Sequence, residues 1–301
     1  MKHKMNRLGN IADRVISPIL FLLPSLSVYL VFTFGTLIYS FILSFTDWDG
    51  LTKNFNFIGF ANYIKLFKDA TFYNALKNNM IWAVISLIIP MFLGLFLAVL
   101  VDRKIRGENI FKSIFYLPQT LSFVVVGVIW SWVYEPTEGI INSTLSAIGL
   151  GSLAQHWIGN TKLTIYSLIL TGAWQITGYT MVLYLAGLRS ISQDVIEASR
   201  IDGANNWQSF WHVVYPMLRN IRTVVIATII INSFKVFDLV YTMTSGGPGE
   251  ASNVLALFMY KEAFWKFKMS YGTAISVIQF LIILIVMVVY LSRTIKQEGE
   301  I

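Results

Sequence analysis

The chain has 301 residues, of which 55% are hydrophobic and 13% are charged, and its mean hydropathy is +0.63. Soluble globular proteins are about 45–50% apolar and about 25% charged, so this composition excludes a disordered chain and argues against an ordinary water-soluble domain. The net charge of +7 is typical of basic cytoplasmic loops in a membrane protein, so we expect a lipid bilayer and no nucleic acid as partner. The absence of cysteine excludes disulfides and thiolate metal sites.

Long runs without charged residues divide the chain into candidate membrane spans. The basic segment 1–16 is followed by an apolar run, 17–45, that is longer than the 7–15 residues of a signal-peptide core, so we predict a retained first transmembrane helix. A sixth candidate, 223–245, is apolar except for Lys235 and Asp238. Four further runs each exceed the roughly 20 residues that cross the hydrocarbon core as a helix, namely 78–101, 113–134, 163–188 and 269–292.

Continuous apolar runs favour helices over the alternating pattern of a membrane β-barrel. The predicted fold class is therefore all-α, a polytopic membrane protein with six transmembrane helices and both termini on one side. That side carries fourteen Lys and Arg residues and the other side eight, which indicates that both termini are cytoplasmic. The predicted organisation is a cytoplasmic N-terminus at 1–16, an extracytoplasmic loop at 46–77, a five-helix core at 78–292 and a cytoplasmic tail at 293–301.

The sequence contains no recognisable set of catalytic or metal-binding residues. It has no Walker-type phosphate loop and no GxSxG motif, and its three histidines (His3, His156 and His212) form no HExxH-like pair. We therefore predict a protein that is not an enzyme, with no catalytic residue, no metal site and no cofactor of its own. Any ATP hydrolysis would need a partner chain.

The connection between the fourth and fifth spans, residues 189–222, is more apolar than a solvated loop. Ser192 is placed to cap a first short helix that stops at Gly203, and Asn205 can start a second one that Pro216 is expected to end. The second helix carries an apolar stripe at helical spacing, formed by Trp207, Phe210, Trp211 and Val214. This pattern leaves two interpretations open: helices lying on the lipid headgroups, or a docking element for a cytoplasmic partner.

The same loop resembles the "EAA" loop of ABC importer permeases, EAA-x3-G-x9-I-x-L-P. Its residues are Glu197-Ala198-Ser199, then Gly203, then Val213-Val214-Tyr215-Pro216, with departures at Ser199, Val213 and Tyr215 that preserve small size or apolar character. Other stretches are similar to the carbohydrate-uptake branch of this family, and the similarity covers about residues 18–295. These stretches are Phe57–Tyr63, Tyr116-Leu117-Pro118 with Trp130, Trp132, Gly139 and Asn142, Arg200–Ala204, and Phe237–Tyr241 followed by Gly246-Gly247-Pro248, which resembles the maltose-type "F" permease.

The resemblance implies a type I ABC importer permease fold (MetI-like) in the bacterial cytoplasmic (inner) membrane, and a role in ATP-driven, binding-protein-dependent uptake of sugars or oligosaccharides. It implies four kinds of partner: a second permease in a pseudo-symmetric heterodimer, two cytoplasmic ATPase copies that carry ATP and Mg²⁺, an extracytoplasmic solute-binding protein, and a carbohydrate substrate. In the family the EAA loop couples the permease to the ATPase. Here the residues assigned to coupling are Glu197, Ala198, Ser199, Asp202, Gly203, Trp207 and Pro216.

Lys235 and Asp238 are the two charged residues within a predicted span. Their i, i+3 spacing would place them on one helical face, where an internal ion pair and a role in lining a water-filled path are both open. The resemblance places sugar-contacting residues on the same stretch, 232–238. An aromatic ring can cover the apolar face of a sugar and an amide can bond its hydroxyls. The predicted substrate-pathway residues are therefore Trp174, Gln175, Tyr179, Asn232, Lys235 and Asp238.

Two other classes of function remain open alongside the importer. An ion-coupled secondary transporter could use Lys235 and Asp238 as a proton relay, although no inverted repeat or pair of broken spans indicates one. A polytopic membrane enzyme would need a catalytic set, which the sequence lacks. The segment 252–268 is expected to form a helix on the outer surface, near the mouth of the cavity.

Overall fold

The computed structural model describes residues 17–103 and 107–298, so the predicted cytoplasmic segment 1–16 and the last positions of the tail lie outside the described residues. Throughout these ranges the regular elements are helices and no strand is formed, which confirms the predicted all-α class. By length and apolar composition, four helices can each cross a membrane, and two bent helix pairs bring the number to six. The structure therefore offers four to six spans, and the second bent pair, 206–217 with 219–235, overlaps the predicted span 223–245 only in part.

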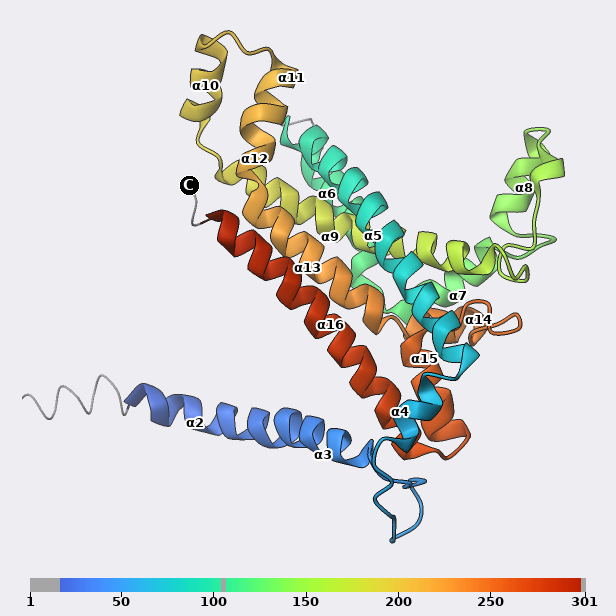
Figure 1. Cartoon of the computed structure of the whole chain (residues 1–301). Coiled ribbons are helices and arrows are strands. Elements are labelled where there is room, and N and C mark those ends of the chain that lie inside the picture. Colours follow the sequence, from blue (N-terminus) through green and yellow to red (C-terminus); the bar gives the residue numbers. More distant parts are fainter. Residues whose placement is uncertain (1–16, 104–106, 299–301) are drawn as a thin grey trace, which may run out of the picture.

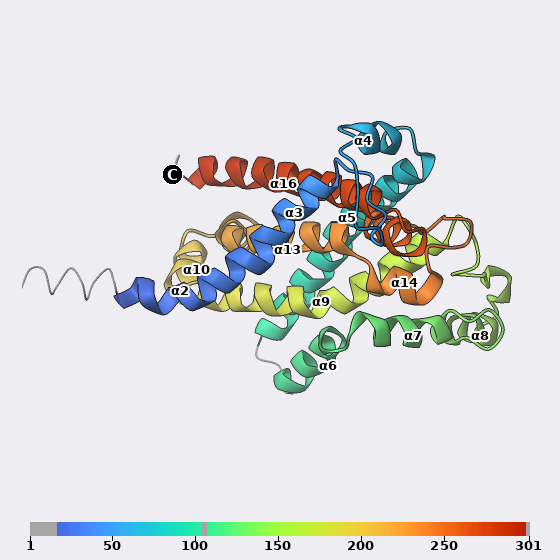
Figure 2. The ribbon, with the colours of Figure 1, turned by 90° about the horizontal axis from the view of Figure 1, so that it is seen from below.

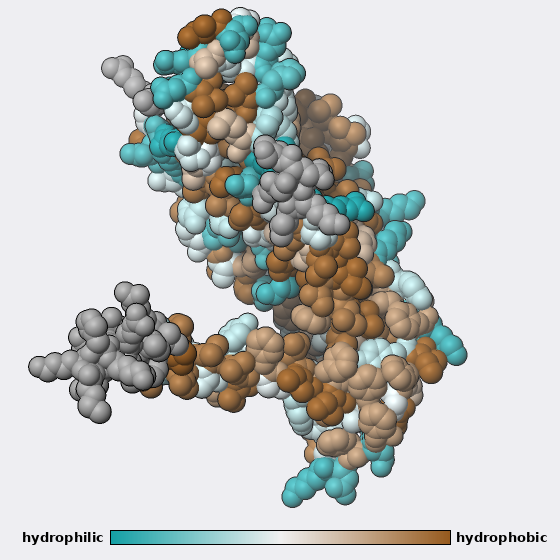
Figure 3. Space-filling view, turned by 60° about the vertical axis from the view of Figure 1, so that its left-hand side comes forward, coloured by the Kyte–Doolittle hydropathy of each residue, from teal (hydrophilic) through white to brown (hydrophobic). Residues whose placement is uncertain are grey.

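The first span is a long rod whose beginning stands apart from the other helices (Figure 1) and whose last turns pack against the last long helix of the chain. It consists, in chain order, of α2 (Ser17–Tyr29), the π-helical turn η2 (Leu30–Gly35) and α3 (Thr36–Leu43). Beyond its end, Phe45 packs with Tyr63 and with Val277 of α16 (Met269–Glu298). Figure 3 shows hydrophobic surface along much of this rod. Such a rod needs an apolar surrounding, which a bilayer supplies.

Three long helices form the packed core: α5 (Ala70–Asp102), α9 (Thr164–Ser190) and α13 (Arg219–Lys235). α16 lies along α13, as both ribbon views show (Figures 1 and 2). The helix α6 (Glu108–Thr120) crosses α9 at a glycine, because a β-carbon added at Gly178 would lie 1.9 Å from the carbonyl oxygen of Phe115. Small residues permit such close approach between membrane helices.

The predicted third span, 113–134, is wrong as a continuous helix. α6 and α7 (Phe123–Val133) instead meet at an angle of 101°. Leu121 between them is extended, and the hydroxyl of Ser122 caps α7 by accepting a 3.3 Å hydrogen bond from the third residue of that helix. The carbonyl of Leu121 accepts a 2.9 Å hydrogen bond from the Gln175 side chain. A serine cap and an amide from another helix thus stabilise a sharp bend inside an apolar run.

The predicted fifth span, 223–245, is also broken. α13 ends at Lys235, two non-helical residues follow, and α14 (Asp238–Thr244) then begins. The expectation that Lys235 and Asp238 share one helical face is therefore wrong. Within the described ranges, the six ion pairs that form include none between these two side chains.

Amide side chains from two other helices hold the end of α13 at this break. Asn79 of α5 donates a 2.8 Å hydrogen bond to the carbonyl of Ser233. Gln279 of α16 donates a 2.9 Å hydrogen bond to the carbonyl of Phe234. These bonds satisfy carbonyls that lose their helical partners at the break, which is the condition for irregular backbone at membrane depth.

The segment 252–268 is buried over 252–258, whereas 264–268 lie at the surface, so the expected outer-surface helix is present only in its last part. It forms α15 (Leu255–Tyr260) and the π-helical turn η5 (Lys261–Trp265). Leu255, Leu257 and Phe258 are almost fully enclosed, and α15 packs between α5 and α16. The helix α15 is therefore part of the core at the end of the molecule where α5 and α16 begin (Figure 1).

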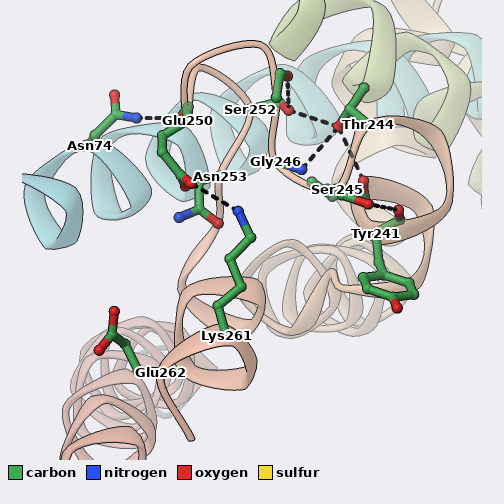
Figure 4. Close-up of polar contacts among 12 residues, drawn as sticks. Asn74, Tyr241, Thr244, Ser245, Gly246, Glu250, Ser252, Asn253, Lys261 and Glu262 are labelled. Carbon is green, nitrogen blue, oxygen red and sulfur yellow. Dashed lines mark hydrogen bonds and ion pairs between the residues drawn. The ribbon is translucent and has the colours of Figure 1, made fainter. Parts of the chain in front are cut away.

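Asparagines of α5 hold the loop that leads into α15. Asn74 donates a 2.6 Å hydrogen bond to the carbonyl of Glu250, and Asn78 donates to the carbonyls of Ala251 (2.9 Å) and Asn253 (2.8 Å). Figure 4 shows Asn74 pointing at this loop, whose Glu250 carboxylate also accepts a hydrogen bond from Lys261. The loop is therefore fixed from α5 rather than being a free connection.

A small lobe projects between α7 and α9 (Figure 1). Its elements are α8 (Ile140–Ala147) and the 3₁₀ turn η3 (Gly151–Leu153). The buried amide of Asn142 organises the lobe and accepts a 2.8 Å hydrogen bond from the indole of Trp157. At its start, the backbone N–H of Glu138 and the hydroxyl of Thr137 donate to the Glu135 carboxylate, which holds the pKa of that exposed carboxyl below its usual range.

Candidate functional site

The predicted pair of helices is present in the loop after α9. The first, α10 (Gln193–Ile201), is capped by the hydroxyl of Ser192, which accepts a 3.3 Å hydrogen bond from the backbone of Asp194. It stops at Gly203, whose φ of +87° lies in the left-handed region that favours glycine. The second helix begins with a reciprocal capping box between Asn205 and Gln208, with two hydrogen bonds of 2.9 Å.

The second helix ends at Met217, one residue after Pro216, close to where this proline is expected to end it. Its parts are α11 (Asn206–Ser209), the π-helical turn η4 (Phe210–Val214) and α12 (Tyr215–Met217). Pro216 lies in the first turn of α12, where a missing N–H is tolerated because the preceding π-helical turn shifts the hydrogen-bond register. After Leu218 the chain bends by 65° into α13.

One buried hydrogen bond joins the two helices of the pair, and two ring contacts order the second helix and its junction with α13. The buried hydroxyls of Ser199 and Ser209 form a 2.7 Å hydrogen bond between α10 and α11. On the second helix, the ring of Trp211 lies 4.9 Å from that of Tyr215, and the guanidinium of Arg222 lies 4.2 Å above the Tyr215 ring. Ser199, which replaces the last alanine of the EAA pattern, therefore serves an internal contact.

The remaining predicted coupling residues face outward. Ile201 and Trp207, which flank the turn at Gly203, are 85% and 71% exposed and form an apolar tip. A large exposed apolar surface beside polar groups is typical of a protein-binding site. The exposed members of the predicted set are Glu197, Ala198, Asp202, Gly203, Trp207 and Pro216.

Both ends of this loop are tied to long helices. At the end of α9, Arg189 forms ion pairs with Glu108 of α6 (2.5 Å) and Asp102 of α5 (3.5 Å). At the start of α13, Arg219 donates a 2.9 Å hydrogen bond to the carbonyl of Thr294 near the end of α16. Figure 1 shows α10 and α11 at the same end of the molecule as the end of α16, opposite α14 and α15. These contacts link the two ends of the loop to five helices, α5, α6, α9, α13 and α16.

A cavity of about 360 Å³ lies at the two broken spans, where α5, α6, α7, α9, α13 and α14 meet. Its polar lining includes Asn232, Lys235 and Asp238, three of the residues predicted for the substrate pathway. Because the helix breaks between Lys235 and Asp238, both can line one cavity without pairing. In the part of the chain that the structure describes, no group of three or more metal-ligating side chains gathers here or elsewhere.

The other three predicted pathway residues lie outside this lining, although they share α9 with it. Gln175 is buried and bonds the bend between α6 and α7. Trp174 is exposed and packs edge-on against Trp130 at 5.5 Å, and Tyr179 is half-buried. The face of α9 that lines the cavity carries Gly172 and Ile176 instead.

The sequence did not single out the other lining residues. Three of these with side chains large enough to contact a ligand are Trp82 of α5, Gln119 of α6 and Phe237 between α13 and α14. Gln119 offers a signal, since it is a lone amide in an otherwise apolar stretch. Trp82 and Phe237 offer none, because aromatic residues are abundant along the whole chain.

Comparison with known proteins agrees with this geometry. The model of the family described as "Binding-protein-dependent transport system inner membrane component" matches residues 90–297. The chain belongs to this family. It is 40% identical over 280 residues to the osmoprotective compounds uptake permease protein GgtC of Synechocystis sp., covering 91% of this chain and 96% of that protein. It is 31% identical over 281 residues to the multiple sugar-binding transport system permease protein MsmF of Streptococcus mutans, covering 92% and 95%.

Solved structures show the same fold. A chain of a bacterial ABC transporter involved in the import of the acidic polysaccharide alginate superposes with a TM-score of 0.82 at 21% identity, covering 96% of this chain and 99% of that one. The predicted ABC importer permease fold is thereby confirmed. The protein is an inner membrane component of a binding-protein-dependent transport system, so the ion-coupled alternative is not favoured.

Proposed function

We propose that this chain is the membrane-spanning permease subunit of an ATP-driven importer of sugars or oligosaccharides and forms half of the translocation pathway. The observation that carries the proposal is the exposed helix pair over 193–217, whose two ends are tied to helices that line or flank a polar cavity. Permeases named for sugar uptake are among its relatives, including MsmF and the xylose/arabinose import permease protein XacH of Haloferax volcanii, which is 33% identical over 281 residues.

The lining of the cavity suits a polyhydroxylated substrate. The side chains of Asn232, Lys235 and Asp238 offer donors and acceptors for hydroxyls, and the rings of Trp82 and Phe237 offer apolar faces. A few polar groups in an otherwise apolar cavity are the usual means of orienting a small ligand. The substrate pathway is accordingly assigned to this cavity rather than to Trp174, Gln175 and Tyr179.

The helix pair is proposed to dock in a cytoplasmic ATPase subunit. The apolar side chains of Ile201 and Trp207 would be buried on docking, and Glu197 would meet a basic residue of the ATPase. Docking can drive transport only if the ATPase state that binds ATP favours one arrangement of the spans over the other. The ion pair of Arg189 with Glu108 and the bond from Arg219 to α16 are the links through which this bias would reach the cavity.

The full importer would contain a second permease, two ATPase copies with ATP and Mg²⁺, and an extracytoplasmic binding protein. The apolar rod α2–α3 and the exposed lining of the cavity support a further membrane partner. A solved alginate importer has been captured with a sugar-loaded periplasmic protein, and this chain shares its fold at 21% identity. Both termini would be cytoplasmic, on the side of the helix pair, in a bacterial cytoplasmic membrane.

The test is uptake by cells that express the whole importer with altered loops. Glu197→Lys reverses a charge on the docking face, and Gly203→Val forces a β-branched residue to a φ of +87°. Both variants are expected to insert in the membrane and to lose uptake of the sugar that the binding protein recognises. Gln193→Ala, an exposed change on α10, is the control and is expected to retain uptake. Wild-type uptake by both loop variants would contradict the proposal.

A further inference from the structure

A cluster of aromatic rings extends from the central cavity to the surface, and within it Phe237 and Tyr260 meet with ring centres 5.2 Å apart. Phe237, which lines the cavity, stacks on Tyr241 with ring centres 5.3 Å apart and an angle of 13° between the planes. Tyr241 then meets Tyr260 at 5.7 Å and Trp265 at 6.4 Å, and these last two rings are 6.2 Å apart. The four rings come from the break after α13, from α14, and from α15 and η5, so the chain brings together residues that are up to 28 positions apart.

The ring cluster lies on the side of the cavity that is opposite the helix pair over 193–217. α14 and α15 lie at the opposite end of the molecule (Figure 1). Exposure is greater at the far end: Phe237 is half-buried, Tyr241 is 37% exposed and Trp265 is 51% exposed. If the helix pair meets a cytoplasmic ATPase, the rings lie on the extracytoplasmic side of the cavity.

Charged groups lie at both ends of the ring cluster. Asp238 follows Phe237 in the cavity lining, and the ammonium of Lys261 lies 6.0 Å from the centre of the Trp265 ring. Figure 4 shows Lys261 reaching the Glu250 carboxylate, to which it donates a 2.9 Å hydrogen bond, with Tyr241 and Ser245 to one side of this pair. A surface that only faced lipid chains would gain nothing from charged neighbours, whereas a sugar presents apolar C–H faces and hydroxyls together.

We propose that Phe237, Tyr241, Tyr260 and Trp265 form a second carbohydrate subsite, on which sugar rings stack between the outer surface and the central cavity. The inference rests on the proposed function, since it requires a sugar substrate. Its new content is a specific outer route with named contacts. The rings would hold the leading units of an oligosaccharide while Asn232 and Lys235 bind the units already in the cavity.

The test uses the complete importer in proteoliposomes, with its second permease, ATPase and binding protein. The probes are xylose, maltose, maltotriose and tri-galacturonate, each at saturating binding protein. The variants are Tyr241→Leu and Trp265→Leu, with Tyr241→Phe and Trp265→Phe as conservative partners. Phe21→Leu changes an 85% exposed ring on the separate rod α2 and is the matched control. Import rate and ATP hydrolysis are measured together.

The import rate of the longest probe that wild type carries is expected to fall about three- to tenfold in each Leu variant, as expected for the loss of one stacking contact. Both Phe variants and Phe21→Leu should stay near the wild-type rate. ATP hydrolysis stimulated by the loaded binding protein should persist, so that more ATP is consumed per sugar imported.

Three results would overturn the inference. Unchanged import in both Leu variants would show that the rings do not contact the sugar. A parallel fall of import and ATP hydrolysis, or an equal fall in the Phe variants, would show that the rings serve packing or assembly. Failure of wild type to import any of the four probes would instead reject the proposed function for these sugars. The two failures are distinguishable, because this one is seen in wild type before any variant is tested.

Discussion

Arg189, at the end of α9, donates a 2.5 Å hydrogen bond to the carboxylate of Glu108, at the start of α6. The two residues are 81 positions apart, and Arg189 immediately precedes the loop that carries the helix pair. Glu108 also bonds Lys112 one turn along α6. The contact therefore joins the exposed loop to the helix whose far end reaches the cavity through Gln119.

Breaking this contact is expected to uncouple ATP hydrolysis from transport. Arg189→Met removes the link between α9 and α6, and the reconstituted importer should then hydrolyse ATP without the usual stimulation by loaded binding protein. Lys112→Met removes a partner of Glu108 that lies on the same helix and should leave the stimulation intact. The exchange Arg189→Glu with Glu108→Arg should restore part of it. Equal behaviour of Arg189→Met and Lys112→Met would contradict this role.

The separation of Lys235 from Asp238 gives a prediction about substrate charge. Because the two side chains do not pair, Lys235→Met should act on the substrate alone and should slow import of an acidic trisaccharide more than import of a neutral one. The variant with both charges exchanged should not regain wild-type rates, since no ion pair is restored. Import of tri-galacturonate and maltotriose by the same proteoliposomes measures both effects. Full recovery in the exchanged variant would show that the residues act as a pair.

Gln175 is expected to act on stability rather than on sugar contact. Gln175→Leu leaves the buried carbonyl of Leu121 without its hydrogen bond, which costs about 1–3 kcal/mol. The midpoint of thermal unfolding in detergent should fall, while import per folded importer should change little. Leu170→Ala, a change at an exposed position of the same helix, serves as the control for thermal unfolding. Loss of import with unchanged unfolding would return Gln175 to the substrate pathway.

Local signals in the sequence predict the helix pair well, and long-range contacts explain what they miss. Ser192, Gly203 and Asn205 act on their own turns, so their spacing is enough to predict where α10 and α11 begin and end. The bends in the third and fifth spans depend on amides from other helices, above all Gln175 and Asn79. A hydropathy pattern cannot show that a distant side chain will bond a backbone carbonyl that lacks its helical partner. The pattern therefore predicts a continuous helix for each of these spans.

The residues that line the cavity can likewise be predicted only in part from local signals in the sequence. Asn232, Lys235 and Asp238 stand out as polar residues in an apolar run, and they do line the cavity. Their relation to one another depends on the break after Lys235, which places both side chains in the lining without an ion pair between them. The residue types of Trp174 and Tyr179 favour contact with a sugar. Which face of α9 meets the cavity, however, is decided by its packing against α5 and α13.

The central claim is that the helix pair over 193–217 contacts a cytoplasmic ATPase, and cross-linking tests it most directly. The chain has no cysteine, so Ala198→Cys introduces a unique thiol on the exposed face of α10, and Ser143→Cys places one in the lobe at the far end. With a short thiol-to-amine cross-linker in membranes that contain the whole importer, Ala198→Cys should join the ATPase subunit with a yield that changes when ATP is added. Ser143→Cys should not. Absence of the Ala198→Cys product, or an equal yield from Ser143→Cys, would contradict the account.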